Sequence, residues 1–375
     1  TAIGLSALQE NTTGTENVAI GSSSLDANTT GDYNVAVGAN SLSTNTTADD
    51  NTGIGVAALK DNTTGASNTA VGRSALKTNT TGANNSALGK DALLSNTTGT
   101  RNTAIGVFSL DANTTADDNT AGGYESLGAN TTGHSNTAFG KSSLKANTTA
   151  NDNTAFGFKA LCTNTSGAVN ASFGGYSLQD NTTGASNTAV GISSLENNTT
   201  ASSNTAVGYR SLYCNTTGYS SVAVGNCALA TNTTGHSNVT VGVNSMKLNT
   251  TGIRNIAIGK DAFEANTTGS DNVAIGFTAL DNNTTGVDNV AVGNNAGDAN
   301  TTGFGNVAIG HNALLVNTAG EVNVSIGCRS MNANTTGNCN TFVGKDAGLS
   351  NTVGFRNSGF GIKAGENVTT GDQNV

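Results

Sequence analysis

Residues 11–27 read NTTGTENVAIGSSSLDA, and the next seventeen residues repeat the pattern as NTTGDYNVAVGANSLST. The unit recurs along the whole chain without an insertion or a deletion, so that the 375 residues hold 22 copies. A fixed short period of this kind is the signature of a repeat architecture, in which each unit stacks on its neighbours. We number the positions of the unit from 1 at Asn11 to 17 at Ala27.

Glycine and small residues occupy fixed positions of the unit. Position 11 is glycine in every copy, as at Gly21, Gly38, Gly55 and Gly72. This predicts either a positive φ or an approach too close for a Cβ atom. Position 9 is mostly alanine, and position 14 is always alanine or serine. We therefore expect something to pack very closely against both.

Larger apolar residues recur at two positions. Position 10 is Ile, Val, Leu or Phe in every copy except at Gly122, and position 15 is mostly leucine, as at Leu25 and Leu42. These two positions are the predicted core. The segment from position 7 to position 11, NVAIG in the first full copy, alternates with period two and is rich in β-branched residues. It is predicted to be a strand.

The charged residues define the geometry of the unit. All 16 Lys and Arg and all 25 Asp and Glu fall at positions 5, 6, 12, 13, 16 and 17. Three pairs of charged corners thus separate three charge-free segments, which indicates a chain that winds round and exposes its corners. The predicted fold is all-β, a parallel β-solenoid (β-roll) of about 22 coils. We expect one continuous array over 1–375, a fragment of a longer fibre. It is expected to be looser over 294–375, where Gly297, Gly348 and Gly365 replace leucine.

Asparagine occupies positions 1 and 7 in nearly every copy, as at Asn11, Asn28 and Asn45 and at Asn17 and Asn34. In a stack of equivalent coils each amide lies above its copy, so the asparagines are expected to form hydrogen-bonded ladders. Because NTT is also an N-glycosylation acceptor, a second interpretation makes the position-1 asparagines glycosylation sites, for example Asn62, Asn79 and Asn96. A buried ladder would exclude glycans.

Composition and motifs argue against several functional classes. The net charge of −9 and the pI near 4.7 disfavour nucleic acid, which needs a basic surface. No apolar run is long enough to insert into a membrane. The five cysteines stand at five different positions of the unit, so no disulfide framework is indicated. The three histidines lie at charged corners without ligand spacing, and no nucleophile, base and acid come together. We expect no enzyme activity, no cofactor and no metal.

The NVAIG and NTAVG segments, followed by Ser/Ala-Leu, resemble the head repeats of the YadA-like trimeric autotransporter adhesins. They are also similar to the NTTG-containing arrays of bacterial and viral tail-fibre-like proteins. The resemblance covers the whole chain, although the adhesin-head unit is shorter and the NTTG segment enlarges the coil. It implies a left-handed parallel β-roll, three chains side by side, and a location outside the cell, on the cell surface or on a virion.

Two questions stay open at the level of sequence. The small residues at positions 9 and 14 suit a close contact between subunits of a homotrimer, but a narrow interior of a single chain would demand them equally. For function, the first expectation is a structural and adhesive fibre, the shaft or head of a cell-surface adhesin or of a phage or virus tail fibre. Its partners would be its own copies and a host-surface receptor or glycan. The alternative is a purely structural extracellular filament or surface coat, with or without N-glycosylation.

Overall fold

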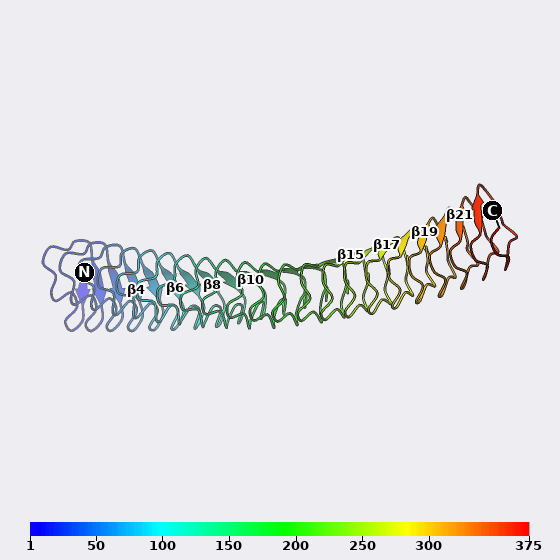
Figure 1. Ribbon diagram of the computed structural model, residues 1–375. Helices are drawn as coiled ribbons and strands as arrows, with labels where there is room; N and C mark the ends of the chain where they lie inside the picture. Colours follow the sequence, from blue (N-terminus) through cyan, green and yellow to red (C-terminus); the bar gives the residue numbers. More distant parts are fainter. Residues whose placement is uncertain (375) are drawn as a thin grey trace. The chain divides into compact units, whose positions relative to one another are not determined.

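The computed structural model describes residues 1–374, which form an all-β parallel β-solenoid with one short strand in each coil (Figure 1). The chain has two compact units, Thr1–Asn187 and Thr188–Val375. The strands of the first unit are β1 Ala2–Ile3, β2 Val18–Ile20, β3 Val35–Val37, β4 Thr52–Ile54, β5 Thr69–Val71, β6 Ser86–Leu88, β7 Thr103–Ile105, β8 Thr120–Gly122, β9 Thr137–Phe139, β10 Thr154–Phe156 and β11 Ala171–Phe173. Those of the second are β12 Thr188–Val190, β13 Thr205–Val207, β14 Val222–Val224, β15 Val239–Val241, β16 Ile256–Ile258, β17 Val273–Ile275, β18 Val290–Val292, β19 Val307–Ile309, β20 Val324–Ile326, β21 Thr341–Val343 and β22 Ser358–Phe360.

Within each unit the coils pair in parallel and in register. The β2 and β3 strands, for example, place Ala19 opposite Ala36, which is a shift of one repeat. Hydrogen bonds between coils also continue outside the strands: the amide of Leu25 donates to the carbonyl of Ser41, and the amide of Thr29 to the carbonyl of Thr46. The whole backbone of the coil thus takes part in the stacking, and the predicted strand is confirmed, although it is limited to positions 8–10.

The interior of each coil is narrow and is lined by positions 1, 4, 7, 9, 14 and 15. Position 9 is buried from Ala19 to Phe342, and position 14 from Ser24 to Ala347. Both positions face the interior of their own chain, so of the two interpretations that the sequence left open, the narrow interior of a single chain accounts for the small residues. The small residues are needed because the two walls of one coil lie close together.

The prediction that position 10 belongs to the core is wrong. Successive side chains of a strand point to opposite faces, so a buried position 9 turns positions 8 and 10 outward. No position-10 side chain is buried among the described coils, and that of Ile20 is 38% exposed. The large apolar side chains of the strand therefore lie on the surface of the chain.

Position 15 supplies the large side chains of the interior and has an unusual backbone. Leu25 and Leu42 are fully buried, and both have φ of 51°. Burial of a leucine side chain contributes about 1.5–3 kcal/mol. A left-handed conformation is strained most by β-branched side chains, and position 15 is never Val, Ile or Thr in any copy. The same φ explains why glycine replaces leucine at this position, as in Gly297, where φ is 60°.

The invariant glycines at position 11 all have a positive φ, and at most of them, between Gly4 and Gly344, a Cβ atom would also clash with the next coil. Gly21 has φ of 133°, and a Cβ atom built on it would lie 2.7 Å from the carbonyl carbon of Gly38 in the next coil. Either condition alone would exclude alanine.

Near the C-terminal end a single aromatic residue fills the space that several glycines leave. Phe342 stands at position 9, where other coils have small residues, and is only 1% exposed. Cβ atoms built on Gly348, Gly359 and Gly365 would each come within 2.7–2.8 Å of its ring. The substitutions that break the repeat pattern in this part of the chain are therefore complementary to one another.

Candidate interaction surface

The outward side chains of the strands form an uncharged surface in each unit, which we call the strand face and define as positions 8 and 10 of every coil. Position 10 is apolar except at Gly122, and position 8 is a Val, Ile or Ala in some copies and a Thr or Ser in the others. No charged residue occupies position 8, 9 or 10 in any copy. At position 10 the side chains of Ile54, Leu88 and Ile105 are 40–51% exposed. Other exposed position-10 side chains are Phe139, Phe156, Phe173, Val190, Val241, Ile258, Ile275 and Ile309.

The strand face of the first unit is uneven at two places. A shallow apolar hollow of about 250 Å³ lies over β5, β6 and β7 and includes Leu88 and Ile105. Further along, Phe139, Phe156 and Phe173 stack in sequence, with ring centroids 5.2 and 5.4 Å apart. Carbon atoms in optimal contact are about 3.5–4.0 Å apart, so each ring is offset from the next and keeps part of its face exposed.

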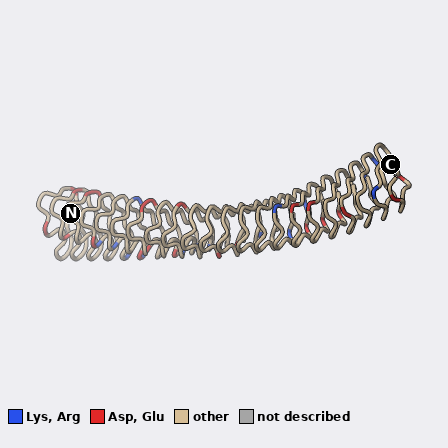
Figure 2. Tube along the Cα trace, in the orientation of Figure 1, with Lys and Arg blue, Asp and Glu red and all other residues tan. Residues whose placement is uncertain are grey.

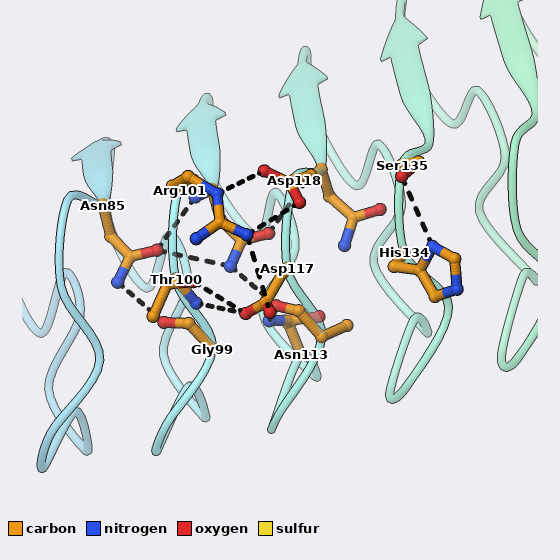
Figure 3. A network of polar contacts seen from close by, with 12 residues as sticks. Asn85, Gly99, Thr100, Arg101, Asn113, Asp117, Asp118, His134 and Ser135 are labelled. Atoms are coloured by element: carbon orange, nitrogen blue, oxygen red, sulfur yellow. Dashed lines mark hydrogen bonds and ion pairs between the residues drawn. The ribbon is translucent and has the colours of Figure 1, made fainter.

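Charged residues occupy the corner positions of the coils and none of the strand-face positions. Figure 2 shows where they lie along the backbone of each unit. Figure 3 shows one such corner, where the Arg101 guanidinium donates to both carboxylate oxygens of Asp118 in the next coil, at 2.6 and 2.9 Å. Arg101 holds the pKa of Asp118 below its ordinary value. The Thr100 hydroxyl donates to Asp117 in the same way, at 3.0 Å. Exposed ion pairs contribute little to stability, so these corners mainly keep the surface soluble.

The asparagines that sequence analysis singled out lie inside the coil as two different ladders. At position 1 the Nδ2 group of Asn28 donates to Oδ1 of Asn11 at 2.9 Å and to the carbonyl of Gly31 at 3.0 Å, and Asn45 repeats the arrangement. At position 7 the backbone amide of Asn34 donates to Oδ1 of Asn17 at 2.9 Å. Both ladders satisfy polar groups that would otherwise be buried without partners.

Burial bears on the glycosylation hypothesis. Asn62, Asn79 and Asn96 are fully buried. The Nδ2 group of each already donates to two acceptors, the carbonyl three residues on and the preceding asparagine of the ladder. A glycan attached to this nitrogen would remove one donor and has no space in the coil. The geometry favours the ladder as the role of these residues.

Most reactive side chains are dispersed along the described chain, although Sγ of Cys328 lies 4.0 Å from Nδ1 of His311 in the preceding coil. No group of three His, Cys, Asp or Glu residues within 1–374 could hold a metal ion, and the five cysteines are free. The His236 ring stacks on Tyr219 in the preceding coil, with centroids 4.5 Å apart. No helix in the described residues is long and apolar enough to cross a membrane.

The fold and the surface define the chain as a parallel β-solenoid repeat protein with an uncharged strand face and charged corners. Comparison with protein-family models and with curated proteins found no match.

Proposed function

We propose that this chain is part of a structural and adhesive fibre, in which copies of the chain pack side by side through their strand faces. The observation that carries the proposal is the strand face itself, which is free of charge, half-buried or exposed in the described coils, and apolar at position 10 in every copy except at Gly122. Soluble monomeric proteins rarely expose contiguous apolar patches larger than a few hundred Å². A surface of this kind indicates that a partner covers it.

The area is sufficient for a stable assembly. Positions 8 and 10 of one coil together expose on the order of 100 Å², much of it apolar, so the coils of one unit together offer on the order of 1,000 Å². A stable interface needs about 800 Å² from each partner. A second copy is the partner best matched to the face, because its side chains repeat at the same spacing along the stack.

The proposed assembly is a homotrimer. Three narrow strand faces can close around a common axis and leave the charged corners in water. The resemblance to trimeric adhesin heads supports the number three and a location outside the cell or on a virion. The proposed role is mechanical and adhesive rather than catalytic, because inside the coil the same buried groups recur 22 times, without a specialised constellation.

Light scattering on the purified chain after size-exclusion chromatography tests the assembly. We expect a mass near three times 37.1 kDa. The double variant Ile54→Lys, Ile105→Lys places charges on the strand face and should give a folded monomer. The matched control Thr47→Lys, Thr98→Lys changes exposed position-3 residues of the same two coils and should remain trimeric. A wild-type monomer at micromolar concentration would contradict the proposal.

The second candidate function is a purely structural filament or coat, for which the stacking of identical coils is sufficient. Electron microscopy of the purified protein separates the two candidates, because a filament requires particles joined end to end and an adhesive fibre does not. Mass spectrometry of protein made in a glycosylating host tests the sugar-coated form of this alternative.

A further inference from the structure

One corner of the first unit contains a hollow whose lining residues occur in this combination only here. This corner notch has a volume of about 370 Å³, within the range of small-ligand sites, and is lined by Phe108, Asp111, Glu125, Gly128, Ala129 and Lys145. These residues stand at positions 13, 16 and 17 of three successive coils. The notch therefore lies on a different side of the coil from the strand face.

The notch exists because a side chain is missing. Position 16 is glycine only at Gly128, and the neighbouring coils carry Asp111 and Lys145 at this position. Gly128 does not have a positive φ, so the backbone does not require glycine here. A Cβ atom built on Gly128 would lie 3.3 Å from Oδ1 of Asp111. An acid and a lysine thus face each other across a gap one coil wide.

The polar groups of the notch differ in their pairing. Nζ of Lys145 lies 2.7 Å from Oε2 of Glu125, and this contact lowers the pKa of Glu125. Asp111 has no ion-pair partner among the described residues, and burial, with the nearby Glu125, raises the pKa of its carboxyl. The Asp111 carboxyl accepts from its own backbone amide and keeps further acceptor capacity, since a carboxylate has about four lone-pair sites, and Lys145 keeps donors beyond the one it gives to Glu125.

An aromatic wall completes the notch. The Phe108 ring packs edge-on against the Tyr124 ring, with centroids 6.2 Å apart and planes at 82°. Nζ of Lys90 lies 5.2 Å from the centroid of Phe108. The ring is held in place by these contacts and gives the notch an apolar surface beside its polar groups.

We propose that the corner notch binds one sugar unit of a neutral glycan. Sugar hydroxyls both donate and accept, so one unit can donate to Asp111 and accept from Lys145 while its C–H face packs on Phe108. The lining carries two acids and one lysine, a net charge of −1, which disfavours an anionic ligand. The lysine facing Asp111 disfavours a simple amine. This inference rests on the proposed adhesive function and names the chemistry of its partner.

The test is isothermal titration of the purified full chain with a panel of neutral hexose and N-acetylhexosamine oligosaccharides. Free amino acids and heparin fragments serve as charged probes. Gly128→Leu fills the notch with a residue that position 16 accepts at Leu94, and Asp111→Asn removes the carboxylate. Lys77→Leu and Asp26→Asn make the same kinds of change at position 16 of other coils and are the matched controls.

We expect at least one neutral oligosaccharide to bind, with affinity about tenfold or more weaker in Gly128→Leu and Asp111→Asn and unchanged in the controls. The proposal is overturned if no neutral oligosaccharide binds, if only the charged probes bind, or if both notch variants bind like the wild type. Light scattering on the same samples separates the two proposals. If the protein is a monomer that binds sugar, only the proposed homotrimer is contradicted. If it is a trimer that binds no sugar, only the proposed sugar site in the corner notch is contradicted.

Discussion

A pair of reciprocal substitutions in one coil tests how the chain distinguishes its two large apolar positions. Leu110 at position 15 is fully buried with φ of 50°, whereas Ile105 at position 10 is 47% exposed in the strand β7. Leu110→Ile and Ile105→Leu exchange the same two side chains. Hydrophobicity and volume hardly change, so only the backbone conformation and the burial differ.

The two substitutions are expected to change the free energy of unfolding by very different amounts. A volume-conserving substitution in a core costs less than about 1.5 kcal/mol. A left-handed conformation costs about 1–2 kcal/mol even for an unbranched residue, which Leu110 already bears, and a branch at Cβ raises this cost further. Because isoleucine is branched at Cβ, we expect Leu110→Ile to destabilise its coil by about 2–3 kcal/mol. Ile105→Leu changes an outward side chain and should stay within about 0.5 kcal/mol.

Native-state hydrogen exchange on the full chain measures both effects locally. The amide of Leu110 donates to the carbonyl of Ser126 in the next coil at 3.1 Å, so its exchange reports the opening of this coil. Leu110→Ile should raise the opening equilibrium roughly 30- to 150-fold, since about 1.4 kcal/mol corresponds to tenfold. If Leu110→Ile opens the coil no more than Ile105→Leu does, the role assigned to the positive φ is refuted.

Three further substitutions test the ladders and the acidic corner. Val368→Asn should raise the free energy of unfolding of the adjacent coils by about 1 kcal/mol in thermal unfolding, because Oδ1 of Asn351 is buried without a partner and Val368 is the only position-1 residue that is not asparagine. A loss of stability would contradict the ladder. Asn62→Asp should lower the free energy of unfolding, measured in urea, by about 3 kcal/mol, because it removes the Nδ2 donor to two buried acceptors. An equal loss in the exposed control Asn84→Asp would contradict the role assigned to the ladder. Burial and neighbouring acids raise the pKa of Asp281 to about 6, so its charged form is disfavoured in the fold and stability falls as the pH rises from about 4 through 6. The free energy of unfolding of Asp281→Asn should therefore equal that of the wild type at pH 4 and exceed it at pH 7.5 by about 1 kcal/mol, a value reduced for solvent screening. A stability difference independent of pH would show that this carboxyl does not cause the loss of stability.

Much of the coil follows from the repeat alone. The length of the unit, the strand at positions 8–10 and the glycine at position 11 all depend on contacts between one coil and its copy. Such contacts impose the same residue in every copy, so they are visible as invariance within one chain. The asparagine ladders belong to the same class, because each amide bonds to its equivalent in the next coil.

The orientation of the strand could not be predicted from side-chain size. Ile105 and Leu110 are equally apolar, but the interior is too narrow for a large side chain on the strand, and alanine takes the inward position there. A signal was present in the choice of residues: position 10 accepts β-branched side chains and position 15 never does. This difference reflects the backbone and separates the outward position from the buried one.

The corner notch was not predicted, because it depends on departures from the repeat. Phe108, Asp111 and Lys145 each look like ordinary variation at a charged corner, and only the stacking of three coils brings them around Gly128. Invariance cannot reveal a site of this kind. The one glycine at position 16 was the only sign of the notch in the sequence. It indicates a notch only once the structure shows which side chains lie around it.

Distances between spin labels on equivalent positions test the stacking of coils most directly. Labels at Thr30→Cys and Thr115→Cys, in a chain whose five native cysteines are replaced by serine, occupy exposed position-3 sites five coils apart in the first unit. With the labelled chain diluted into an excess of unlabelled chains, so that distances between copies of the proposed trimer do not contribute, stacked coils predict a narrow distribution near 24 Å, at roughly 4.8 Å per coil. A broad distribution, or a distance that does not grow in equal steps as the second label moves from coil to coil, would contradict the β-solenoid.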